Sequence, residues 1–203
     1  MESTEILELI ARTHHAGSHG DWPHLGGRAA FHRAGELVVN GSLGWARPAP
    51  GELVPIAAPP GSWPVHLEVV TDADPRYGMP PSWVSLAVVL LAAPEEIAEA
   101  LAAGRVDDPI GDYQPLGPVG ALWSDDAPLP IGWDRAFADR AAAHLADGER
   151  AGHVPNLLAV PADSGRGLKC VAFRTASPAG TAGAGAVRGP DGRLLCLFLF
   201  DTD

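Results

Sequence analysis

The sequence predicts an α+β fold built around a mostly antiparallel β-sheet, sandwich-like or a partly open barrel, with about three short helices. Two observations predict it. Most apolar runs are short, alternating or rich in β-branched residues, and they end at glycine, proline, asparagine or aspartate. Between these runs lie three stretches whose apolar residues recur at helical spacing.

Length and composition bound the domain organisation. A chain of 203 residues, 46% hydrophobic and 19% charged, can bury one core and has too few charges for a disordered protein. No repeat or low-complexity linker divides it. We therefore expect a single domain over residues 1–203, with a helix and a His/Gly-rich lead-in loop in residues 1–34 and a β-rich core in residues 35–203.

The first expected helix lies at the N-terminus. Ser3 can cap it, and Glu5 suits the positive end of the helix dipole. Apolar residues then recur at helical spacing from Ile6 to Ile10. A loop is expected next. It lies within residues 13–32, which hold five of the chain's eight histidines.

Part of this histidine-rich loop has the donor atoms and the spacing of a zinc site. The candidate ligands are His14, His19, Asp21 and His24. Metal ligands usually come from rigid elements, whereas glycine or proline interrupts this loop every few residues. We therefore expect no cofactor, with zinc or another divalent metal as the alternative, and we expect Trp22 and Pro23 to pin the loop against the sheet.

Residues 36–71 are expected to form strands. Two short apolar runs around Asn40-Gly41 predict a hairpin with a type I′ turn, because both residues tolerate a positive φ. Residues 58–71 alternate between the two faces of a half-buried strand. His66 lies on the more polar face, where a solvated or hydrogen-bonded histidine is commoner than a metal ligand.

The middle of the chain predicts a strand, a helix and another strand. Residues 82–92 are almost wholly apolar, which is typical of a central strand covered on both faces. Pro94 then begins a helix that ends at Gly104. A Pro/Gly/Asp-rich connection leads from there into a strand within residues 118–128.

The second half of the chain returns to strands after one helix. Helical spacing is clearest in residues 133–150, and strands are expected in residues 156–162, 168–176 and 193–201. The glycine-rich segment 180–189 lacks the following helix and the acidic residue of a dinucleotide-binding loop. We interpret it as a flexible loop.

Charge limits the classes of partner. The formal charge of −11 repels polyanions, so we expect neither nucleic acid nor an anionic membrane as a partner. The first residues lack a secretory signal, and no apolar run reaches the roughly 20 residues of a membrane helix. We expect a cytoplasmic protein that binds another protein or a small molecule, in an oligomeric state that stays open.

The two cysteines, Cys170 and Cys196, each lie in an apolar run typical of a strand. So sparse a pair does not form a disulfide framework, and we expect two buried thiols. Spacing along the chain does not fix the order of strands in a sheet, so whether the two thiols face each other across paired strands stays open.

Known catalytic motifs are missing from the sequence. It has no G-x-S-x-G elbow, phosphate loop, H-E-x-x-H or C-x-x-C. Several aspartates lie beside prolines or turns, where such residues usually bond the local backbone and face water. These are Asp72, Asp74, Asp107, Asp108, Asp125 and Asp126. The catalytic residues therefore stay unknown.

Four motifs follow one another along the chain: a hairpin at 35–41, a Pro/Gly/Trp strand entry at 60–65, an apolar strand at 83–91 and a closing strand at 190–203. In this order they resemble a bacterial family known only as domain of unknown function 4241, over roughly residues 35–203. A further turn of that family is matched in part by Gly120, Trp123 and Asp125.

One departure from the family concerns its Gly-Asp-Gly loop. The corresponding segment of this chain, residues 177–187, contains no acidic residue. If that aspartate serves a site in the family, this chain lacks it, whereas a mere turn can be built by other glycines. The resemblance implies no activity, because the family has none assigned.

Two hypotheses about function follow. The first is a non-catalytic cytosolic domain that binds a protein or a small ligand, an immunity-like antidote to a toxin being one form of it. An accessory domain that works through another polypeptide is a variant of this hypothesis. The second is a small-molecule metabolic enzyme with a Trp/His-lined pocket, metal-assisted or not, whose residues converge only in the fold.

Overall fold

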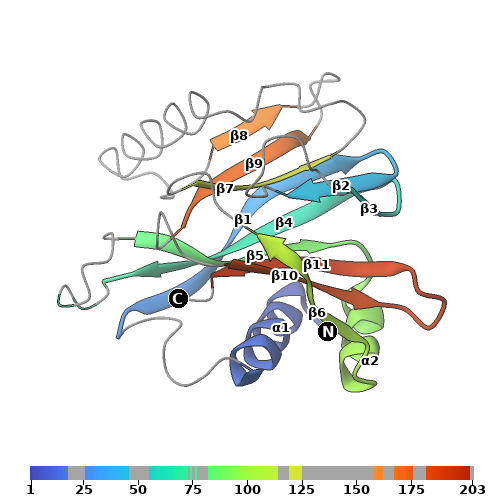
Figure 1. Ribbon diagram of the computed structural model, residues 1–203, viewed down its shortest axis with the longest axis horizontal. Coiled ribbons are helices and arrows are strands. Elements are labelled where there is room, and N and C mark those ends of the chain that lie inside the picture. Colours follow the sequence, from blue (N-terminus) through green and yellow to red (C-terminus); the bar gives the residue numbers. More distant parts are fainter. Residues whose placement is uncertain are drawn as a thin grey trace.

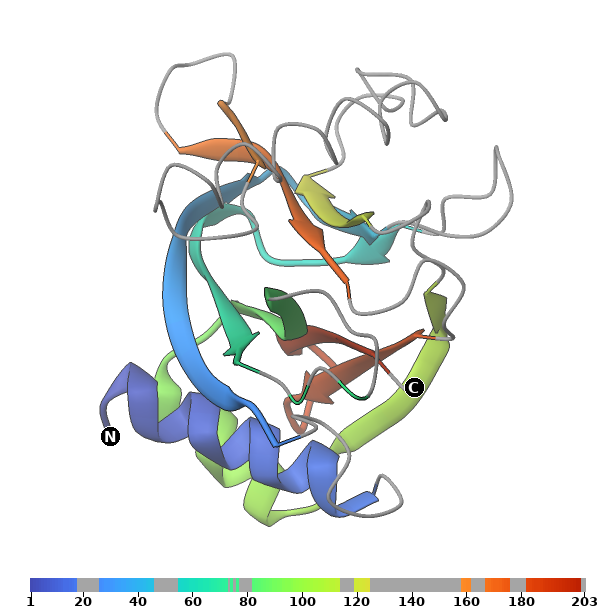
Figure 2. The same cartoon turned by 90° about the vertical axis from the view of Figure 1, so that its left-hand side faces the viewer.

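The computed structural model describes residues 1–17, 26–45, 55–72, 74, 76, 82–113, 119–124, 158–161, 167–175 and 182–201. In these residues one large mixed sheet curls into a half-barrel, and two helices lie against its outer face (Figures 1 and 2). The largely antiparallel, partly open barrel is confirmed. Because strands dominate, the fold is mostly β rather than evenly mixed α+β.

Helices and strands alternate unevenly along the described chain, with both helices in its first half. In chain order the elements are α1 (Ser3–Gly17), β1 (Arg28–Val39), β2 (Ser42–Trp45), β3 (Ile56–Ala57), β4 (Gly61–Thr71), β5 (Ser82–Leu90), α2 (Pro94–Ala102), β6 (Val106–Tyr113), β7 (Val119–Ser124), β8 (Leu158–Pro161), β9 (Leu168–Arg174), β10 (Ala182–Arg188) and β11 (Leu194–Asp201).

The strand order is β3-β2-β7-β9-β1-β4-β5-β11-β10-β6, with β8 paired to β9 outside this path. The contact of β1 with β9 is parallel, and the other pairings are antiparallel. Figure 2 shows the resulting C-shaped curve, with β1 and β4 forming its back.

The sheet buries apolar side chains on both faces. The interior of the curl is filled from its two ends, for example by Trp45 of β2, Trp123 of β7 and Leu197 of β11. A second cluster lies on the outer face, where Ile6 of α1 and Ile97 of α2 pack against β5 and β11. These two cores explain why all nine residues of β5 are buried, as expected of a strand covered on both sides.

The N-terminal boundaries differ from the sequence prediction. Helix α1 begins at Ser3, and the Glu5 carboxylate accepts a hydrogen bond from the backbone N–H of Glu2, so Ser3 is not the cap. The helix continues to Gly17 and includes the backbone of His14, which was expected in a loop. Strand β1 begins at Arg28, so part of the expected lead-in loop is sheet, because it pairs with the whole of β4.

The turn at Asn40-Gly41 is present, but the hairpin is not formed. Strand β1 pairs with β4 and β9, whereas β2 pairs with β3 and β7. Gly41 has a φ of 120°, but Asn40 lacks the positive φ that a type I′ turn needs. The carbonyl of Gly41 instead accepts a hydrogen bond from the N–H of Ala58, so β3 occupies the position beside β2.

The glycine-rich segment is a strand, not a flexible loop. In β10, Gly183 lies opposite Phe200 and Gly185 lies opposite Phe198 of β11. A Cβ atom at either glycine would come closer than 3.0 Å to the opposing ring. The glycines therefore let the two phenylalanine rings lie across the neighbouring backbone, a tertiary reason that a local pattern does not show.

The Pro/Gly/Asp-rich connection after α2 is also a strand, β6. It pairs with β10 and ends the sheet order. The register shifts opposite Ala184 and Ala186, around Pro109. Proline is tolerated there because an edge strand needs hydrogen bonds on one side only. The third expected helix, in residues 133–150, lies outside the described residues.

The two cysteines are buried and free, as expected. Cys170 of β9 belongs to the interior core, whereas Cys196 of β11 belongs to the outer one. Because β1, β4 and β5 separate β9 from β11, the thiols do not face each other across a strand pair. Among the described residues, neither helix has the length and apolar character needed to span a bilayer.

Candidate functional site

Most of the metal ligands predicted from the sequence lie outside the described residues. The backbone of His14 belongs to the last turn of α1, while its side chain and the residues His19, Asp21 and His24 lie outside the described residues. Within the described part of the chain, no group of three His, Cys, Asp or Glu side chains could hold a metal ion. The zinc hypothesis therefore stays an untested prediction.

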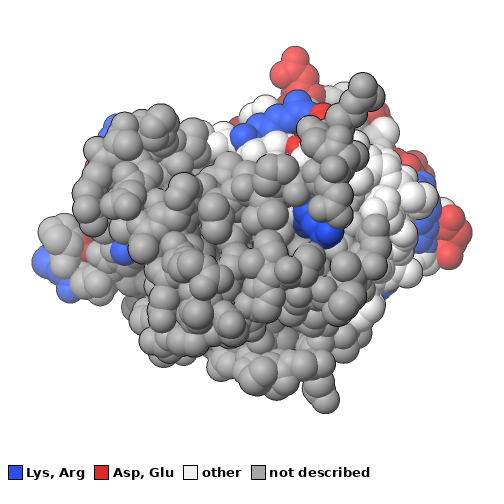
Figure 3. All heavy atoms as spheres, turned by 90° about the horizontal axis from the view of Figure 1, so that it is seen from above, with Lys and Arg blue, Asp and Glu red and all other residues white. Residues whose placement is uncertain are grey.

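Of the aspartates expected at turns, Asp72, Asp74 and Asp107 have described side chains, whereas the side chains of Asp108, Asp125 and Asp126 lie outside the described residues. Asp74 accepts a hydrogen bond from the backbone N–H of Arg76 two residues on, the expected local contact. Asp72 and Asp107 instead pair with arginines on neighbouring strands, Arg28 and Arg188. All these groups lie at the surface, and seen from above in Figure 3 the described basic side chains are scattered among acidic ones.

The candidate site is a groove of about 550 Å³ between α1 and the outer face of β1 and β4. Figure 2 shows α1 crossing this side of the sheet. The apolar part of the wall comes from Leu7 of α1 and from Ala29, Ala30 and Phe31 of β1. The polar part comes from Arg33, His66 and Glu68 in the sheet and from Thr4 and Glu8 on the helix.

Strand register brings four of these side chains into one array. In the antiparallel pair of β1 and β4, Phe31 lies opposite Glu68 and Arg33 lies opposite His66. Residues two apart on a strand share a face, and directly opposite residues have Cβ atoms about 5 Å apart. The array therefore holds one aromatic ring, one guanidinium, one imidazole and one carboxylate.

Glu68 is the buried member of this array, with only 5% of its surface exposed. The Ser85 hydroxyl of β5 donates a hydrogen bond of 2.6 Å to Glu68 Oε2. A register shift opposite Glu68 and Val69 leaves Ser85 as an extra residue of β5. Such bulges redirect side chains, and this one places a donor beside a carboxylate that is costly to bury without one.

His66 is half-buried beside Glu68. Burial lowers the pKa of its imidazole below the ordinary value of 6.5, and the positive charge of Arg33 lowers it further. Near neutral pH the ring is therefore uncharged, with one nitrogen that donates and one that accepts. The polar face expected for His66 is confirmed.

Arg33 lines the groove and pairs with Glu36. Its guanidinium donates a hydrogen bond of 2.6 Å to Glu36 Oε1, and the other oxygen of Glu36 accepts one of 2.8 Å from the hydroxyl of Ser62. Arg33 and Glu36 are both about half exposed. The polar groups of the groove thus have neighbours that fix their positions.

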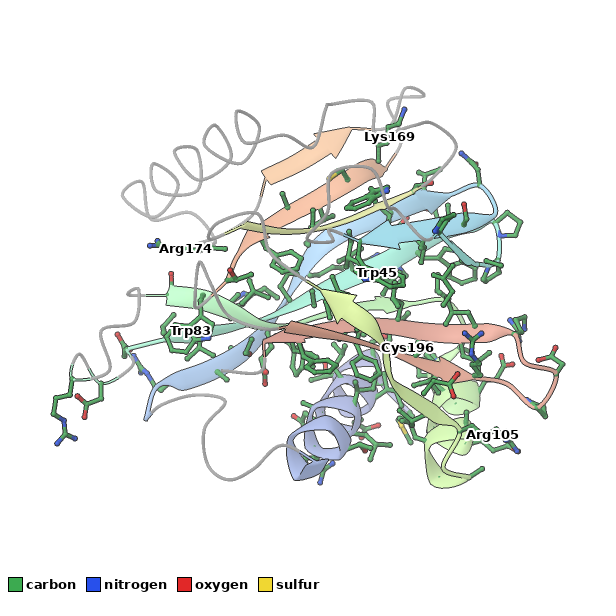
Figure 4. The ribbon with its side chains drawn as sticks, in the orientation of Figure 1. Trp45, Trp83, Arg105, Lys169, Arg174 and Cys196 are labelled. Carbon is green, nitrogen blue, oxygen red and sulfur yellow. The ribbon has the colours of Figure 1, made fainter. Side chains whose placement is uncertain are left out.

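The expected Trp/His-lined pocket is only partly present in the described residues. The groove contains His66, but its aromatic wall is Phe31. Trp45 and Trp123 are buried in the interior core, and Figure 4 shows Trp45 between the two layers of the curled sheet. Serine within the apolar run of β5 was the one sequence signal that a polar partner lies across the sheet.

Comparisons with known proteins assign no family or function to this chain. No protein-family model, curated protein or solved structure matches this chain. The resemblance to domain of unknown function 4241 therefore stays a prediction. What the chain binds has to be argued from the groove itself.

Proposed function

We propose that the chain is a non-catalytic binding domain that holds a small molecule in the groove between α1 and strands β1 and β4. The observation that carries this proposal is the composition of the groove. An apolar wall faces three polar side chains that converge from two paired strands. Its volume of about 550 Å³ lies within the range of about 300–1,000 Å³ typical of small-molecule sites.

The fixed positions of the polar groups support binding. Ser85 holds the Glu68 carboxylate, and Glu36 holds the Arg33 guanidinium. Groups that are positioned before a ligand arrives lose little conformational entropy when it binds. The site is built on paired strands, which position side chains more rigidly than loops do.

An enzyme is the second candidate, favoured by a neutral imidazole two residues from a carboxylate. His66 can accept a proton, and Glu68 lies next to it on the same face of β4. Among the described lining residues, however, only Thr4 has a hydroxyl and none has a thiol. An enzyme at this site would therefore use the imidazole and the carboxylates of these lining residues, with Thr4 as the one hydroxyl among them.

The proposal is tested by filling the groove. Ala29 is an exposed residue of the groove wall, so the substitution Ala29→Trp should block the site without disturbing either core. The matched control is Ala57→Trp, at an exposed position of β3 outside the groove. We expect a panel of small amphiphiles to shift the backbone NMR resonances of β1, β4 and α1 in the parent protein and in A57W.

In A29W these shifts should disappear while the spectrum stays that of a folded protein. If no compound in the panel perturbs the groove residues of the parent protein, or if A29W and A57W respond alike, the proposal is wrong. Turnover of a bound compound that stops on His66→Gln would decide for the enzyme instead.

A further inference from the structure

Two polar side chains of the groove have hydrogen-bonding groups that the described residues leave unused. Within the described part of the chain, neither ring nitrogen of the half-buried His66 has a hydrogen-bond partner. The Arg33 guanidinium has five N–H donors, and its hydrogen bond to a described residue is a single one from Nη2 to Glu36. Arg33 lies opposite His66 in the pair of β1 and β4, so these groups are side by side on one face.

The charges around these groups favour a negatively charged acceptor. The positive charge of Arg33 acts on the His66 imidazole and lowers its pKa, so the potential that Arg33 adds at the ring is positive. Glu68 is already engaged, because Ser85 of β5 donates a hydrogen bond of 2.6 Å to it and it has a further interaction. Glu8 is exposed on α1, where water screens its charge.

We propose that the groove binds a small organic monocarboxylate, with its carboxylate between Arg33 and His66 and its hydrocarbon part against the apolar wall. This inference rests on the binding function proposed above and names its ligand class. The apolar wall is formed by Phe31, Leu7 and Ala29, and covering it with a hydrocarbon chain removes apolar surface from water.

The donors of Arg33 and His66 suit a carboxylate. A guanidinium is planar, and two of its N–H groups can bond both oxygens of one carboxylate. The neutral imidazole of His66 has one N–H that can donate to the same group. Glu36 shows that a carboxylate approaches Arg33 from this face, with Oε1 2.6 Å from Nη2, and it leaves most of the N–H groups for a ligand.

The same charges limit the ligand to one negative charge. Glu36 neutralises part of the Arg33 charge, and the chain as a whole carries a formal charge of −11. A polyanion would be repelled by this excess of acidic groups, whereas a monocarboxylate with an apolar tail gains contacts with the groove wall as well.

The test compares three probes of similar length that differ in charge. Hexanoate, hexanamide and hexylammonium are titrated separately into the full chain near neutral pH, and their dissociation constants are measured by NMR. We expect hexanoate to bind at least about tenfold more tightly than the neutral hexanamide, as one charge-assisted hydrogen bond would provide, and hexylammonium to bind most weakly. The ring resonances of His66 should shift in the hexanoate titration.

Variants then assign the preference to Arg33. Arg33→Gln removes the charge and should reduce the preference of hexanoate over hexanamide to near onefold. Glu36→Gln removes the competing negative charge, so it should tighten hexanoate binding about threefold and leave hexanamide almost unchanged. The matched control is Arg193→Gln, at a half-exposed arginine that pairs with Glu96 outside the groove, and it should retain the full preference.

The outcomes separate this inference from the proposed function. Equal binding of hexanoate and hexanamide in the groove, tightest binding of hexylammonium, or a full preference in Arg33→Gln overturns the carboxylate inference and leaves the binding function standing. Absence of any effect of all three probes on the groove overturns both. If Arg33→Gln does not fold, Glu36→Gln decides alone, and an unchanged or weaker affinity for hexanoate in that variant overturns the inference.

Discussion

At the scale of single residues, His66 shows how position on a strand sets chemistry. Alternation along β4 predicts the face on which it lies, and the structure confirms that face. Its partners are set by the fold, since Arg33 lies opposite it across β1 and β4. Burial and this neighbouring charge both disfavour the imidazolium.

The lowered pKa of His66 predicts a pH-dependent stability. In the unfolded chain the imidazole has its ordinary pKa of 6.5, so below about this pH the unfolded state binds more protons than the folded state. The free energy of unfolding should therefore fall as the pH is lowered from about 7 to about 5.5. Urea denaturation at several pH values measures this loss.

Replacement of His66 isolates the effect. His66→Gln should remain polar and flatten the pH dependence in that range, whereas Glu99→Gln, at an exposed position of α2, should retain the slope of the parent protein. An equal slope in H66Q and the parent protein would show that other groups cause the loss.

Glu68 marks a limit of sequence reasoning at this scale. The same alternation puts Glu68 on the polar face with His66, but Glu68 is buried there, in a groove that residues of α1 also line. A helix that precedes a strand by about fifty residues cannot be aligned with it from local spacing. The groove was therefore missed, although the residue types on its floor were correctly placed.

At the scale of elements, the local patterns of β5 and α2 were sufficient. All nine residues of β5 are buried, and α2 begins at a proline. Each of these local patterns predicts its element without knowledge of the neighbouring strands. The patterns failed where a strand depends on its neighbour, as in β10 and β6. Glycine is typical of loops, and its presence in β10 is explained only by the aromatic rings of β11 that lie against it.

The glycines of β10 make a testable prediction. Gly185→Ala should place a methyl group against the ring of Phe198 and lower the free energy of unfolding by about 2 kcal/mol, the typical cost of overpacking a core. Phe198→Leu in the same background should recover part of the loss, because it removes the ring that the methyl group meets. Chemical denaturation of both single variants and the double variant measures this coupling.

Strictly additive losses in the double variant would contradict close contact between the two positions.

The turn at Asn40-Gly41 shows a different limit of local patterns. Its residues do specify a reversal of the chain, but the choice of partner strand belongs to the sheet as a whole, and β2 pairs with β3 and β7.

At the scale of the whole molecule, the sheet separates two cores, with one thiol in each. The curled, largely antiparallel sheet was predicted from its many short strands and turn residues. The order of its strands was not, because sequence patterns do not reveal which distant strands pair. The histidine cluster also stays undecided, since most of it lies outside the described residues.

The two thiols report on the two cores separately. Burial raises the pKa of Cys170 to about 12 and also raises that of Cys196, and a thiol reacts through its thiolate. We expect neither cysteine to react with an aromatic disulfide reagent near pH 8 until the protein unfolds in guanidinium. The absorbance of the released thiolate gives the number of groups that react.

The variants Cys170→Ala and Cys196→Ala, each with one remaining thiol, compare the cores under mild denaturant. Equal labelling rates would indicate that both cores open in one cooperative event. Fast labelling of the folded protein at either position would contradict the burial described above.

Strand β11 lies between β5 and β10 near the centre of the outer core, yet it is the last strand along the described chain. During synthesis on the ribosome, β5 and β10 have no common neighbour until residues 194–201 have emerged. Until then, the edge of β5 that does not pair with β4 and the edge of β10 that does not pair with β6 have no partner strand. Closure of the sheet therefore depends on a long-range strand pairing, which favours slow folding.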